Sequence, residues 1–294
     1  MTSARHILKN IRRTLGRALE HDTFNTAKAA AYSGMMCFFP AVLVFAALVS
    51  VVPEGLSVLG EMRGSLEEVL PPGTMLLLQN SLTERPLGSV QVLLSATSVS
   101  VFAALGVMLT LMDGFRRAYG VERDNWRFWE KRIRALMLVP IVLVPLGLAS
   151  LLVVFGHQIE IWTIERGGHE LRRIVLIFWR MARWTVAVTT GASVLAALYH
   201  FGTKRTEHWG RVLTGAIATT LVWFPATLAF GWYVTRVADY SRFYGSFAAG
   251  IATLVWLYLT CFSVLLGAEL NGVLYQDRVD RLAHDNTADT VSSL

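Results

Sequence analysis

A carboxylate inside a long apolar segment is the first candidate for chemistry in this chain. Glu269 stands in the sequence GAELN, two residues before Asn271 and close to the end of the last apolar run. Ionisable groups inside apolar helices are costly, so each is a candidate site. Glu269 is suited to hold a proton or cation, or to act in a gate, with Asn271 beside it. The alternative is a structural ion pair with an arginine of residues 113–134.

A row of arginines in another apolar segment is the second candidate. Arg173 and Arg180 are seven residues apart and lie almost in line on a helix, with Arg183 within about 60° of Arg180. A guanidinium binds phosphate through two parallel hydrogen bonds, which suits an anionic lipid. The alternative is snorkelling to head groups, or pairing with the nearby carboxylates Glu160, Glu165 and Glu170.

His157 ends the preceding apolar run on the same predicted side as these arginines. It either lines a cavity shared with them or caps a helix at the interface. The seven histidines show no metal-ligand spacing such as H-x-H, and the chain has no Walker sequence. We therefore expect no metal, no cofactor and no enzymatic activity.

The basic residues 113–134 include the aromatic residues Trp126, Phe128 and Trp129. Basic and aromatic residues together are typical of a single-stranded nucleic-acid groove. In a short loop next to a membrane they more often form an interfacial anchor. We expect membrane lipids, some of them anionic, as partners, and no nucleic acid. The oligomeric state stays open.

The elements that must position these residues are membrane helices. Hydrophobic residues make up 54% of the chain and charged residues 16%, against about 25% charged in soluble domains. Apolar runs of about 20 residues predict membrane spans. We predict an all-α polytopic bundle over residues 29–275, with six spans at about 29–52, 89–112, 135–157, 174–201, 212–235 and 244–274.

The remaining segments are read from their residue patterns. Residues 1–28 predict a basic amphipathic helix, lying either on the membrane or against the protein's own loops. Residues 53–88 predict one or two short amphipathic helices, and residues 276–294 a polar, disordered tail. Small residues at 245–250 predict close helix packing. Kinks are expected at the prolines inside spans, which are Pro40, Pro140, Pro145 and Pro225.

Orientation follows from the distribution of lysine and arginine. Eighteen of the 27 lie in the two terminal segments and in the connections after the second and fourth spans, against seven in the alternate connections. The positive-inside rule then predicts that both termini are cytoplasmic.

Four motifs resemble the YihY/BrkB-type family of bacterial inner-membrane proteins. YGSFAAGIATLVWLYLTCFSVLLGAELNGVL is similar to that family's last span and is the most specific match. AAAYSGMMCFFPAVLVFAAL resembles its first span, and GFRRAYGVERDNWRFWEKR its second cytoplasmic segment. TGAIATTLVW resembles the start of its fifth span, although Thr214 stands where a proline is frequent. The resemblance covers residues 25–275.

The resemblance implies six spans with both ends inside, in the bacterial inner membrane. The family is linked in general terms to envelope lipid handling and serum resistance, and it has also carried a ribonuclease label. The first functional hypothesis is a transporter or permease-like protein for an envelope lipid or other amphiphile. The second is a non-transporting membrane scaffold or assembly factor, and the third, which the residues favour least, is a ribonuclease.

Overall fold

The computed structural model describes residues 2–51, 90–121, 126–166, 169–203, 208–237 and 247–292. Within these ranges all regular structure is helical, and six helices are long and apolar enough to cross a membrane. Helices suit this environment because they satisfy their backbone hydrogen bonds internally, without water. The predicted all-α fold with six candidate spans is confirmed. The sidedness of the termini stays a prediction, and residues 53–88 lie outside the described ranges.

The six long helices overlap the six predicted spans, and most extend beyond them. Their bounds are α2 Thr23–Val51, α6 Val90–Ala118, α7 Phe128–Arg166, α8 His169–Phe201, α9 Trp209–Trp232 and α11 Ala248–Ser292. A π-helical turn, η1 Tyr233–Val237, follows α9 directly. The basic segment 113–134 is therefore not one loop, because α6 reaches Ala118 and α7 begins at Phe128.

The four prolines at which we expect kinks all lie within helices. Pro40 is in α2, Pro140 and Pro145 are in α7, and Pro225 is in α9. Each helix continues past its proline. Whether each proline bends its helix stays a prediction.

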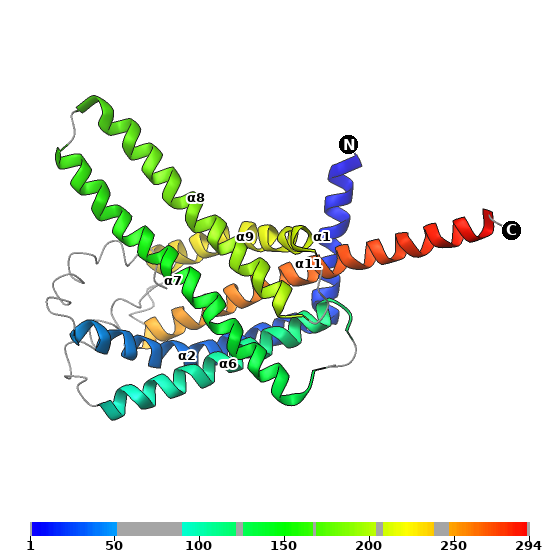
Figure 1. Ribbon diagram of the computed structural model, residues 1–294, viewed down its shortest axis with the longest axis horizontal. Coiled ribbons are helices and arrows are strands. Elements are labelled where there is room, and N and C mark those ends of the chain that lie inside the picture. The colour runs from blue at the N-terminus through cyan, green and yellow to red at the C-terminus, as the bar shows by residue number, and fades with distance from the viewer. Residues whose placement is uncertain are drawn as a thin grey trace.

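The helices form a bundle with two different ends (Figure 1). α2 packs against α6 and α11, α11 also packs against α6 and α9, and α8 packs against both α7 and α9. At one end, here called the α1 end, α1 packs on α11 and α2. At the opposite end, here called the far end, α7 and α8 diverge from the other helices. The buried core includes Phe115, Leu138, Tyr199 and Leu265.

The N-terminal segment differs from the single helix predicted over residues 1–28. α1 spans Thr2–Glu20 and ends at a turn, after which α2 begins. Asp22 has a φ of 56°, a left-handed conformation that aspartate tolerates better than most residues. Its carboxylate accepts a hydrogen bond from Asn25 Nδ2 at 2.7 Å. The turn redirects the chain from α1 into the first candidate span.

The C-terminal segment also differs from the prediction. In place of a disordered tail over residues 276–294, α11 continues to Ser292. The extension agrees with the sequence, because no glycine or proline follows Gly272. It also agrees with a contact near its start, where Asp277 forms an ion pair with Arg13 of α1.

Candidate functional site

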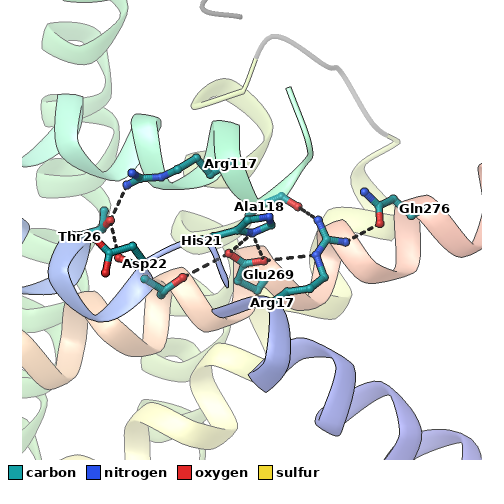
Figure 2. Close-up of polar contacts among 9 residues, drawn as sticks. Arg17, His21, Asp22, Thr26, Arg117, Ala118, Glu269 and Gln276 are labelled. Carbon is teal, nitrogen blue, oxygen red and sulfur yellow. Dashed lines mark hydrogen bonds and ion pairs between the residues drawn. The ribbon is translucent and has the colours of Figure 1, made fainter. Parts of the chain in front are cut away.

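Glu269 lies at the centre of a polar cluster at the α1 end (Figure 2). The residue is only 1% exposed. His21 Nδ1 lies 2.9 Å from its Oε1 and 3.1 Å from its Oε2. Thr23 Oγ1 donates to Oε1 at 3.3 Å, and Arg17 Nε lies 3.8 Å from Oε2. These four residues are here called the Glu269 cluster.

Arg17 joins three helices at this point. Its two terminal nitrogens donate to the Gln276 Oε1 atom at 2.7 Å and to the Ala118 carbonyl oxygen at 2.8 Å (Figure 2). Because Ala118 is the last residue of α6, the guanidinium also caps a helix C-terminus, where cations are favoured. One side chain of α1 is thereby bound to both α6 and α11.

The contact with Glu269 indicates which ring nitrogen of His21 carries a hydrogen. An ionised carboxylate only accepts hydrogen bonds, so the His21 Nδ1 atom carries a hydrogen when it contacts Glu269. His21 and Thr23 are hydrogen-bond partners of the carboxylate, His21 for both oxygens and Thr23 for Oε1, and Arg17 adds an ion pair to Oε2. Both oxygens of this buried carboxylate therefore have polar partners within the protein.

The prediction of an ion pair at Glu269 named the wrong arginine. The ion pair predicted with an arginine of residues 113–134 is made instead with Arg17, from α1. Arg117 lies nearby but donates to Thr26 Oγ1 (Figure 2). The turn at Asp22 is the feature that sequence reasoning missed, because an uninterrupted helix would carry Arg17 and His21 away from α11.

Asn271 does not contact Glu269 in any described interaction but joins α11 to α9. Its Oδ1 accepts from the Gly215 backbone N–H at 2.9 Å, and its Nδ2 donates to the Val212 carbonyl at 3.1 Å. Both atoms of the side-chain amide are therefore used within the bundle. The pairing of Asn271 with Glu269 in one site, which the sequence suggested, is not seen.

The crossing of α9 and α11 is unusually close, and Tyr199 of α8 packs against it. A Cβ added to Gly267 would lie 1.8 Å from Thr219 Oγ1, 2.5 Å from the Tyr199 hydroxyl and 2.8 Å from the Gly215 carbonyl. The Tyr199 hydroxyl donates to the Val264 carbonyl at 2.6 Å and is 2.7 Å from Thr219 Oγ1. We call this group the α9–α11 contact.

Arg183 is the member of the arginine row whose side chain the structure describes. It is 8% exposed, although its neighbours Met181 and Trp184 on α8 are exposed. The ring of Trp184 contacts Phe224 of α9, at 6.1 Å between centroids. Arg183 therefore faces the protein interior rather than the surrounding lipid.

The other outer candidates lie on described helices, but their side chains are outside the described part of the structure. Arg173 and Arg180 are on α8, and His157 is near the end of α7. Their roles stay predictions. Arg183 and Glu269 are on different helices, α8 and α11, and no described contact joins them.

The basic residues 113–134, which include the end of α6 and the start of α7, form ion pairs and ring contacts at the α1 end. Lys131 Nζ lies 2.6 Å from Asp113 Oδ1, joining α7 to α6. Arg134 lies over the Trp126 ring at 4.1 Å. Trp129 is exposed, as expected for an interfacial anchor.

Metal-ligand side chains do not gather anywhere in the part of the chain that the structure describes. No group of three or more histidine, cysteine, aspartate or glutamate side chains lies close enough there to hold an ion. The two cysteines, Cys37 and Cys261, are both free.

Comparison with known proteins gives a family match over most of the chain. The family model described as Virulence factor BrkB matches residues 14–291. A ribonuclease-like protein of Bacillus subtilis, YfkH, is 26% identical over 258 residues, which cover 87% of this chain and 91% of that protein. No solved structure matches the chain.

Two further relatives carry the name UPF0761 membrane protein. The one from Aromatoleum aromaticum is 28% identical over 93% of this chain, and the one from Chromohalobacter salexigens is 25% identical over 92%. The matches span 65% and 64% of these two relatives, which is slightly less than two thirds of their length.

Proposed function

This chain belongs to the Virulence factor BrkB family, and we propose that it is a multi-pass protein of the bacterial inner membrane that handles an anionic amphiphile of the envelope, as a transporter or permease-like protein. The names of its relatives establish a membrane protein and leave the activity open. The proposal therefore rests on the residues of this chain. It includes no enzymatic step, and the ribonuclease-like name is that of the Bacillus relative.

The orientation we propose follows from where the basic helix ends meet. α1, the end of α6, the start of α7 and the start of α9 lie at the α1 end (Figure 1). These segments belong to the four regions that hold most of the lysines and arginines. With the positive side in the cytoplasm, the α1 end is cytoplasmic and the far end faces the periplasm.

Burial of Arg183 is the observation that carries the proposal. Arg183 precedes Phe201, the last residue of α8, by about 27 Å of helix, which approaches the full hydrocarbon thickness of about 30 Å. That rise places Arg183 close to the far boundary of the hydrocarbon layer, at the level of lipid head groups, and an inward-facing arginine within a membrane span is a candidate binding site by default. We infer that the anionic head group of an amphiphile entering between the diverging helices binds the Arg183 guanidinium in addition to its contacts within the protein.

Glu269 and Asn271 have structural roles in this proposal. Both carboxylate oxygens and both amide atoms contact other helices of the bundle. A substrate would have to displace these contacts to reach either residue. The two residues are therefore reassigned from binding substrate to holding the α1 end together.

Retention of anionic lipid in native mass spectrometry tests the function. Wild-type protein extracted with its lipids should retain phosphatidylglycerol or cardiolipin. Arg183→Ala should lose most of that signal, and Arg183→Lys should recover it only in part, because lysine supplies charge without the planar fork. Arg236→Ala is the matched control, since Arg236 is an exposed arginine in η1, after the end of α9.

Equal retention by wild type and Arg183→Ala would reject Arg183 as the lipid contact. Absence of retained anionic lipid from the wild type would reject the lipid-handling proposal itself. That second result would favour the alternative, a membrane scaffold that binds partners without carrying lipid. Gel filtration of each variant separates lost binding from lost folding.

A further inference from the structure

An exposed apolar stripe runs along α1. Leu8, Ile11, Leu15 and Leu19 are 69%, 48%, 49% and 68% exposed. Their spacing of three or four residues places them on one face of the helix. In a water-soluble helix that face packs against the body of the protein. Here the opposite arrangement holds, because the polar side of α1 is the side that docks.

The docked side of α1 is bound to α11 by charged side chains. Arg13 pairs with Asp277, and Arg17 with Gln276 and Glu269. Thr14 and Ala18, which each follow one of these arginines in the sequence, are buried beside them on the docked side. α1 therefore has a fixed orientation on α11, and its exposed stripe has a fixed direction.

The residues of α1 fall into three sectors around its axis. At about 100° per residue, the apolar stripe and the docked side are roughly a third of a turn apart. Lys9, Arg12 and Glu20 occupy the third sector and are exposed. A helix with separate docked, apolar and charged sectors suits a position where protein, hydrocarbon and water meet.

The position of α1 relative to the spans agrees with that arrangement. In Figure 1, α1 runs across the end of the bundle and crosses α11. Only two residues separate Glu20, where α1 ends, from Thr23, where the first candidate span begins. A helix connected so closely to a span and lying across it is held at the level of the membrane surface.

We propose that the apolar stripe of α1, formed by Leu8, Ile11, Leu15 and Leu19, embeds in the lipid leaflet at the α1 end. Lys9 and Arg12 then lie beside it at the level of anionic head groups, which attract basic residues near a membrane surface. The amphipathic pattern alone left open whether α1 contacts lipid or protein. The docking of α1 resolves this question. Helix α11 packs against the polar side of α1, so the apolar stripe points away from the protein and towards the lipid. The proposal holds whether or not the protein carries a lipid.

Fluorescent probes on full-length protein in nanodiscs test the proposal. The probe NBD is attached to Leu15→Cys in a background with Cys37→Ala and Cys261→Ala, and the bilayer contains phosphatidylethanolamine and phosphatidylglycerol. Glu20→Cys is the matched control, because Glu20 is exposed on the same helix in the charged sector. Leu19→Cys is a second reporter in the stripe, in case one labelled variant fails to fold.

The expected result is opposite quenching at the two sectors. Lipids with nitroxide-labelled acyl chains should quench the Leu15 and Leu19 probes at least about twofold more than the Glu20 probe, since an interfacial helix buries its apolar face by several ångströms. Aqueous iodide should show the reverse order. Equal iodide access at Leu15 and Glu20 would overturn the proposal.

Shielding of the Leu15 probe from both quenchers would also overturn it, because protein would then cover the stripe. If that shielding decreased on dilution to one chain per nanodisc, the cover would be a second copy of the chain. If it persisted there, another part of the same chain would be the cover. The lipid-retention assay of Arg183 is independent of all these outcomes.

Discussion

The α1 end and the far end of the bundle differ in how neighbouring helices are joined. At the α1 end, hydrogen bonds join α1 to α6 and α11, and others join α8 and α9 to α11. The helices α9 and α11 also approach closely there, at Gly215 and Gly267. In the middle of α7, by contrast, large apolar side chains are exposed at Leu143, Val144 and Leu148. A Cβ on Gly147 would meet no described atom within 4 Å.

This difference has a physical reason that is specific to membranes. Lipid tails are as apolar as leucine, so burying apolar surface between helices gains little there. Close packing and interhelical hydrogen bonds must hold the helices together instead. The end that contains both should be the rigid one, and the end with lipid-facing surfaces should tolerate substitution. A fixed α1 end with diverging α7 and α8 also suits a protein that admits an amphiphile at the far end.

Two glycine substitutions give the largest expected contrast between the ends. Gly267→Ala places a methyl group within 3 Å of Thr219, Tyr199 and Gly215, so we expect a loss of roughly 3 kcal/mol or more, or no folded protein. Gly147→Ala on α7 should leave stability unchanged or slightly raised, since alanine favours helix. Thermal unfolding in detergent measures both. Equal stability of the two variants would contradict the proposed difference between the α9–α11 contact and the open surface of α7.

Glu269→Gln tests whether charge holds α1 to the bundle. The substitution leaves Arg17 without its buried anion, although Arg17 keeps Gln276 and the Ala118 carbonyl, so we expect a loss of about 2 kcal/mol. The control is Glu130→Gln, because Glu130 forms an exposed pair with Arg134 at 3.5 Å worth about 0.3–0.5 kcal/mol. Proteolysis between α1 and α2 should also become faster in Glu269→Gln only.

A stable Glu269→Gln variant that loses lipid retention would give the opposite assignment. Glu269 would then belong to the functional site, as a proton or cation group. Wild-type stability together with wild-type lipid retention would reject both assignments. The comparison therefore separates a residue that holds the end together from one that acts on substrate.

The sequence predicts the helices well because their signal is local. Runs of about 20 apolar residues predict six spans, and six long apolar helices are found. The same reasoning fails at Asp22, where one left-handed residue ends α1 inside a continuous amphipathic pattern. Aspartate has only a modest preference for the left-handed conformation. The end of α1 before Asp22 therefore depends on contacts with other helices and could not be predicted from residue type alone.

The partners within the site are not local and could not be read from spacing. His21 and Glu269 are 248 positions apart, and both arginines of residues 116–117 were nearer candidates in the predicted topology. Of the residues 245–250, where close packing is predicted, 245 and 246 lie outside the described ranges, and at Gly250 a Cβ would make ordinary contacts of 3.6 Å and 3.7 Å. A much closer approach is found at Gly267, and finding it required knowing where α9 crosses α11.

Tyr199→Phe should produce the smallest of the expected effects, within the α9–α11 contact itself. It removes the hydrogen bonds to the Val264 carbonyl and to Thr219 Oγ1 without creating a large cavity. Interhelical hydrogen bonds in membranes average about 0.6 kcal/mol, so we expect a loss of roughly 1 kcal/mol. Tyr32→Phe is the control, because Tyr32 is exposed on α2.

A double-mutant cycle with Thr219→Val makes this small effect interpretable. If the two hydroxyls stabilise the α9–α11 contact as a pair, the double variant should lose less than the sum of the single variants, by about 0.5 kcal/mol. The Tyr199 hydroxyl has one hydrogen, which it donates to the Val264 carbonyl, so Thr219 must be the donor between the pair. Removing Thr219 Oγ1 then leaves the Tyr199–Val264 bond in place, and Thr219→Val should cost less than Tyr199→Phe. A larger loss from Thr219→Val would assign the stabilising role to the packing of Thr219 against Gly267 rather than to the hydrogen bonds.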